Sequence, residues 1–162
     1  MQSARFADLL ELLAEHEVDF IVVGMTAGIL HGAPVTTVDV DIVHRRTSEN
    51  VVRLLGALEA LDAVYRHDPR KLRPRESHLL GPGHQLLATT HGDLDCLGTI
   101  DEDRGYDELL EQTEELSLSS GRTVRLVSLP ALIEAKERCG RPKDLAALPV
   151  LRATLAERKK QP

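Results

Sequence analysis

The sequence has little aromatic character, with no tryptophan, two tyrosines and two phenylalanines among 162 residues. A platform that stacks successive nucleic-acid bases on aromatic rings is therefore not expected, and the core must be aliphatic. Cysteine is equally scarce, since only Cys96 and Cys139 are present. Two cysteines are too few for a disulfide framework or a cysteine-rich zinc site.

The chain also lacks a long apolar run and an excess of positive charge. No segment approaches the roughly 18–20 apolar residues of a membrane span, and the first residues lead into an amphipathic stretch that carries acids, unlike a signal peptide. The 20 Lys and Arg residues against 26 Asp and Glu give a net charge of −6, which excludes a generally basic nucleic-acid binder. We therefore expect a cytoplasmic protein with reduced thiols and no membrane partner.

The pattern of apolar residues predicts both helices and strands within one domain, residues 1–162, whose C-terminal part at about 128–158 is helical. Helices are predicted at 6–13, 26–30, 50–61, 106–115, 129–138 and 144–158, and strands at 20–23, 38–43, 85–90, 94–98 and 123–127. The segment 66–84 is rich in proline, glycine and arginine, which predicts a loop with one short strand near 78–80. This order indicates an α+β (mixed α/β) fold.

The most informative segment is Asp39-Val40-Asp41 on the second predicted strand. Side chains two residues apart in a strand point to the same face, so the two carboxylates lie side by side. Like charges this close are unfavourable unless solvent or a cation lies between them. The segment is therefore either the wet face of an edge strand or part of a Mg²⁺ site, because Mg²⁺ prefers carboxylates completed by phosphates and water.

Gly24 ends the first predicted strand and precedes a short helix. A glycine at such a junction is often only a turn residue, but it also exposes backbone N–H groups and allows a phosphate to approach closely. Together with the aspartate pair it indicates metal-assisted phosphoryl chemistry.

Asp95 interrupts an apolar strand, between Leu94 and Cys96. It is either an outward-facing residue on a half-exposed strand or a third carboxylate that completes the metal site and activates an acceptor hydroxyl. Asp93 follows Gly92 and is interpreted as a turn residue. Cys96 is interpreted as a small buried hydrophobe whose pKa the neighbouring carboxylate raises.

The remaining polar residues give weaker signals. The histidines show no zinc-binding spacing, so surface or loop positions are favoured over a zinc hydrolase built on Asp41 and His44. The basic stretch from Arg70 to Arg75 is either a solvated loop or a contact for an RNA backbone or a triphosphate tail.

Residues 20–43 resemble the signature of the DNA polymerase β-like nucleotidyltransferase superfamily. That signature is an apolar strand, a glycine followed by Gly or Ser, a helix, and then Asp-apolar-Asp or Glu. The segments Leu132-Ile133-Glu134-Ala135-Lys136 and Arg141-Pro142-Lys143-Asp144 are similar to the closing motifs of small bacterial members related to the AbiEii toxin group. The resemblance covers roughly residues 15–155 and implies a small mixed sheet with helices packed against it.

The resemblance also implies roles for individual residues in NMP transfer from an NTP to an acceptor hydroxyl. Mg²⁺ (or Mn²⁺) would be the cofactor. The metal would be held by Asp39, Asp41 and Asp95, with Lys136 and Asp144 as further catalytic residues, and the nucleotide by Gly24, Met25, Thr26 and Thr37. The family has Gly or Ser where this chain has Met25, so Thr26 is the candidate to supply the hydroxyl.

Three hypotheses about function follow from the resemblance. The first is a toxin-like transferase that modifies RNA or protein, with an antitoxin or a second subunit as partner. The second is a catalytically silent nucleotide- or partner-binding module in which Met25 closes the phosphate site. The third is an enzyme that acts on a small molecule. RNA acceptors predict that the Arg70–Arg75 loop lines the cleft, whereas a small-molecule acceptor predicts a concave pocket.

Overall fold

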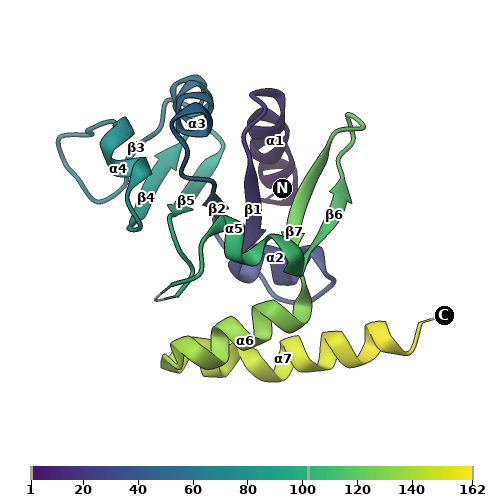
Figure 1. Ribbon diagram of the computed structural model, residues 1–162. Helices are drawn as coiled ribbons and strands as arrows, with labels where there is room; N and C mark the ends of the chain where they lie inside the picture. The colour runs from purple at the N-terminus through teal and green to yellow at the C-terminus, as the bar shows by residue number, and fades with distance from the viewer. Residues whose placement is uncertain (1, 102, 162) are drawn as a thin grey trace.

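The computed structural model describes residues 2–101 and 103–161, and these form a mixed sheet with helices around it (Figure 1). The strands are β1 (Phe20–Val23), β2 (Asp39–His44), β3 (Val64–Tyr65), β4 (His84–Thr89), β5 (Gly92–Leu97), β6 (Thr113–Ser117) and β7 (Thr123–Val127). The helices are α1 (Gln2–Glu15), α2 (Gly24–Leu30), α3 (Ser48–Ala60), α4 (Glu76–Leu80), α5 (Tyr106–Leu109), α6 (Leu129–Cys139) and α7 (Pro142–Lys159), with a 3-10 turn, η1 (Leu110–Gln112), after α5. The predicted mixed α/β class is confirmed.

The strands of the described residues lie in the order β3-β4-β5-β2-β1-β7-β6. β2 runs antiparallel to β1 and parallel to β5, and β1 runs parallel to β7. The helices α6 and α7 lie beyond the end of the sheet at which β1 ends, at the bottom of Figure 1. The end of β1, the middle of β2 and the two C-terminal helices therefore meet in one region.

The core is aliphatic, as the scarcity of aromatic residues predicts. β1 is buried on both faces, and one face of β2 contributes Val40 and Ile42, both fully buried. Leucines of α1 and α3 join the same cluster, including Leu9, Leu13 and Leu54. Burial of this face leaves the opposite face of β2, which carries the aspartates, directed away from the core.

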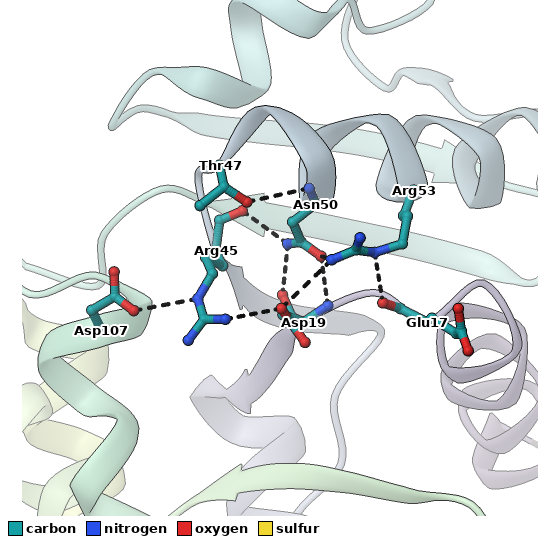
Figure 2. A network of polar contacts seen from close by, with 7 residues as sticks. All are labelled: Glu17, Asp19, Arg45, Thr47, Asn50, Arg53 and Asp107. Atoms are coloured by element: carbon teal, nitrogen blue, oxygen red, sulfur yellow. Dashed lines mark hydrogen bonds and ion pairs between the residues drawn. The ribbon is translucent and has the colours of Figure 1, made fainter.

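A polar network fixes β1 and β2 against each other at the end opposite α6 and α7 (Figure 2). The fully buried Asn50 accepts a hydrogen bond from the Asp19 amide at 2.7 Å and donates to the carbonyls of Asp19 at 3.0 Å and Arg45 at 2.8 Å. Asp19 directly precedes β1 and Arg45 directly follows β2, and Arg45 also binds the Asp19 carboxylate at 3.1 Å. The network thus helps to set the register that places Val23 opposite Asp41.

Several sequence predictions of local structure are wrong. The helix predicted at 106–115 ends with η1, and residues 113–117 form the edge strand β6. The short strand predicted near 78–80 is part of helix α4, and β5 begins at Gly92 rather than at Leu94. Short amphipathic segments fit either helical or strand spacing, and here pairing with β7 decides the outcome for residues 113–117.

No described helix is both long and apolar enough to span a bilayer.

Candidate active site

Four aspartates lie on one face of two adjacent strands. The parallel register of β2 and β5 pairs Asp39 with Asp93 and Asp41 with Asp95. Because side chains alternate along each strand, these four carboxylates share the face opposite the buried residue Val40. Asp93 is therefore a member of β5 and of this acidic face, so its interpretation as a turn residue is wrong.

Gly24 lies directly beside Asp41. The antiparallel register brings Val23 opposite Asp41, and Gly24 follows with a φ of +63°, which favours glycine. A β-carbon added at Gly24 would lie only 2.1 Å from Asp41 Oδ2. The glycine is required here because any side chain would overlap the carboxylate.

Burial and the neighbouring carboxylates change the protonation of Asp41. Burial, the negative charge of Asp95, a hydrogen bond to Asp95 and the negative charge of Asp39 together raise the pKa of Asp41 to about 7, although Lys136 acts to lower it. The cluster thus holds more negative charge than its protein surroundings stabilise.

Arg66 provides a positive charge at this face. It directly follows β3, and its Nη2 donates to Asp95 Oδ1 at 3.0 Å while its Nη1 lies 3.5 Å from Asp93 Oδ2. Nη1 also donates to the Leu87 carbonyl at 3.0 Å. Sequence reasoning missed Arg66 because β3 is only two residues long and the arginine stands in a segment predicted as loop.

The helices α6 and α7 contribute a second charged group. Asp144 is fully buried and binds Lys136 Nζ at 3.2 Å and Arg141 Nε at 2.6 Å. Burial alone would raise the pKa of Asp144, but the hydrogen bonds from Arg141 and Lys136 outweigh burial and lower it. Asp144 also accepts from the Arg141 amide at 3.3 Å, so it both caps α7 and orients Lys136.

These residues border one cleft of about 380 Å³. It is lined by six of the residues that the sequence suggested, namely Gly24, Asp39, Asp41, Asp95, Lys136 and Asp144. The three other residues that the sequence suggested for nucleotide binding, Met25, Thr26 and Thr37, do not line the cleft. The basic loop is also outside the cleft, because no residue from Arg70 to Arg75 lines it. Arg70 instead pairs with Asp68, and Arg73 pairs with Asp62.

The three remaining candidates have structural contacts that account for their positions. Thr26 is buried, and its hydroxyl donates to the Asp39 carbonyl at 2.7 Å, so it is not available as a substitute phosphate ligand. Thr37 bonds the Asp39 backbone at 3.4 Å. Met25 packs against the core, and its Cε would lie 3.4 Å from a β-carbon added at Gly28. The methionine side chain therefore packs against the body of α2 and does not border the cleft.

The acidic face suits a divalent cation by its chemistry. Asp39, Asp41 and Asp95 offer only carboxylate oxygens, the ligands that Mg²⁺ prefers. Burial and then the charges of Asp95 and Asp39 raise the pKa of Asp41, and a cation would compensate those charges. Among the described residues, no three acidic, histidine or cysteine side chains converge closely enough to form a ready-made metal cage. Asp95 is instead paired with Arg66.

Comparisons with known proteins identify the fold. No family model and no curated protein sequence matches the chain. Similar solved structures include TM1012 of Thermotoga maritima, described as a putative nucleotidyltransferase, with 16% identity over 93% of this chain and 89% of that one and a TM-score of 0.56.

Two solved structures of ANT(2″)-Ia are also similar. One describes this antibiotic-resistance factor in solution, with a TM-score of 0.59 and 16% identity over 96% of this chain and 86% of that one. The other is its complex with adenylyl-2″-tobramycin, with a TM-score of 0.57 and 18% identity over 93% and 87%. The chain therefore has the nucleotidyltransferase fold.

Proposed function

We propose that this protein transfers an NMP group from an NTP to an acceptor hydroxyl. The observation that carries the proposal is the register that places Asp41 next to Gly24 and opposite Asp95. Asp39, Asp41 and Asp95 would hold Mg²⁺, which supplies charge stabilisation for the attacking and departing oxygens when bound. Like the family resemblance, the fold shared with an antibiotic adenylyltransferase supports this reaction class.

The residues of the cleft divide the remaining work of the transfer. The acceptor oxygen attacks the α-phosphorus, the bond to the bridging oxygen of the β-phosphate breaks, and pyrophosphate leaves. Asp95 accepts the proton of the acceptor hydroxyl. Lys136, held by Asp144, stabilises the negative charge of the triphosphate, and the absence of a side chain at Gly24 leaves room for the Asp41 carboxylate.

The cleft favours a small acceptor that is neutral or anionic. Its lining contains the basic side chains of Arg66, Lys136, Arg141 and Lys143, and the only acid besides the three metal-binding candidates is the buried Asp144. An acceptor with several ammonium groups, such as tobramycin, would find no free carboxylate once a metal occupies the others. The RNA-directed toxin role draws no support from the basic loop, and the silent-module hypothesis draws none from Met25, because neither borders the cleft.

The test is a transfer assay with each α-labelled NTP, Mg²⁺ and either a small-molecule extract, tobramycin or total RNA. Asp41→Asn is the inactive variant, and Asp8→Asn, an exposed aspartate on α1, is the matched control. We expect label in the small-molecule fraction with the wild type and Asp8→Asn, but not with Asp41→Asn. Label confined to RNA would overturn the acceptor class, whereas absence of both transfer and Mg²⁺-dependent NTP binding would overturn the transferase assignment.

A further inference from the structure

Arg66 is held at three points above the acidic face. Its amide donates to the Leu86 carbonyl at 3.0 Å, its Nη1 donates to the Leu87 carbonyl at 3.0 Å, and its Nη2 donates to Asp95. The side chain is only 18% exposed. A guanidinium anchored to β4 in this way is fixed before any ligand binds, unlike a mobile surface arginine.

The contact uses only one oxygen of Asp95. Nη2 of Arg66 bonds Oδ1 of Asp95, while Asp95 also faces Asp41 across the strand pair. The other arm of the fork lies against Asp93, the fourth carboxylate of the same face. One planar group thus fixes the orientation of Asp95 and neutralises Asp93.

We propose that Arg66 is a positioning residue for the metal-binding carboxylates: it orients Asp95 toward Asp41 and keeps Asp93 out of the metal-binding set. The inference rests on the proposed function. A group that orients a metal ligand typically contributes 10–100-fold to metal affinity, at order of magnitude. A simple counter-ion would act in the opposite direction, because removal of a positive charge near a cation site strengthens cation binding.

The opposite signs make a direct binding test decisive. Mn²⁺ binding is measured by electron paramagnetic resonance, with a non-hydrolysable NTP analogue present, for the wild type and Arg66→Met. Arg70→Met is the matched control, because Arg70 is exposed and pairs with Asp68 of its own loop. We expect Mn²⁺ to bind Arg66→Met about 10–100-fold more weakly and Arg70→Met as tightly as the wild type.

Two further variants test the geometry of the fork. Arg66→Lys keeps the charge, but one ammonium group cannot reach Asp95, Asp93 and the Leu87 carbonyl together, so we expect weakened binding here too. This variant also serves if circular dichroism shows that Arg66→Met does not fold. Adding Asp93→Asn to Arg66→Met removes the released competitor and is expected to restore part of the affinity; failure to restore it would overturn the role given to Asp93.

The outcomes separate this inference from the proposed function. Unchanged or tighter Mn²⁺ binding by both Arg66 variants would overturn the positioning role and leave the transferase assignment standing. A wild type that binds no Mn²⁺ with the nucleotide analogue would overturn the transferase assignment and, with it, the role of Arg66.

Discussion

Replacing Asp41 with asparagine is expected to stabilise the metal-free protein at about pH 8 while it abolishes nucleotidyl transfer. Burial and the adjacent carboxylates raise the pKa of Asp41 from 3.8 to about 7, so the folded state binds this proton more tightly than the unfolded chain does. Ionisation of Asp41 therefore lowers stability. The loss is absent below about pH 4, grows as the pH rises toward 7, and is complete above about pH 8.

The magnitude follows from the size of the shift. Each pKa unit corresponds to about 1.4 kcal/mol, so the shift of Asp41 sets an upper bound of about 4 kcal/mol. Burying the amide of asparagine offsets part of this gain, and we expect about 2 kcal/mol. For a chain of 162 residues that corresponds to a rise in Tm of roughly 4–8 °C.

The assay is thermal unfolding of the wild type and Asp41→Asn in chelator at several pH values, with Asp8→Asn as the matched control. The difference in Tm should be near zero at about pH 4 and should grow toward pH 8, and Mg²⁺ with NTP should stabilise only the wild type and the control. A difference that is independent of pH would refute the electrostatic reasoning. So would an Asp41→Asn protein that is less stable than the wild type at pH 8.

Three other substitutions or reagents test the structure around the site. Gly24→Ala places a side chain at a φ of +63° and against the Asp41 carboxylate, so it should lower transfer activity by two or more orders of magnitude. Gly121→Ala is the control in the same assay, because Gly121 also has a positive φ, +89°, but has no atom within 4 Å of an added β-carbon. Asn50→Ala should lower the free energy of unfolding by about 3 kcal/mol in urea titrations, because it removes the hydrogen bonds by which the buried Asn50 side chain joins Asp19 and Arg45. A thiol reagent should modify only Cys139 in the native protein and both cysteines in urea. The reason is that Cys96 is fully buried, and that burial and the adjacent carboxylate raise the pKa of its thiol. Rapid modification of two thiols in the native protein would contradict this prediction.

Much of the candidate site could be predicted from sequence because it depends on strand spacing. The alternation of Asp39, Val40 and Asp41 determines which face each side chain takes, and the structure places them as that alternation requires. The position of Gly24 could be predicted in the same way, since a buried strand that ends in glycine predicts a tight junction with the next helix. These inferences need only local geometry, which the sequence encodes directly.

The remaining features depend on contacts between distant segments. Arg66 reaches Asp95 across 29 positions of sequence, and no local pattern around either residue indicates that pair. The first residues of strand β6, 113–115, were predicted as the end of a helix, and pairing with β7 excludes that structure. Thr26 was predicted to bind phosphate, but its hydroxyl bonds the Asp39 carbonyl, an outcome that spacing alone does not distinguish.

The acidic face is unfavourable in isolation, and its geometry persists because other parts of the fold stabilise it. Asn50 and its partners help to hold β1 against β2 from the opposite end of the strands, so the site's geometry does not depend on favourable contacts among the carboxylates alone. Arg66 pairs with the carboxylates of β5, whereas Asp41 on β2 keeps a raised pKa because it is buried and lies beside Asp95 and Asp39. The uncompensated charge is thus concentrated at Asp41, the position next to Gly24. A divalent cation would gain the most binding energy at that point, since it would remove the largest unfavourable interaction of the metal-free site.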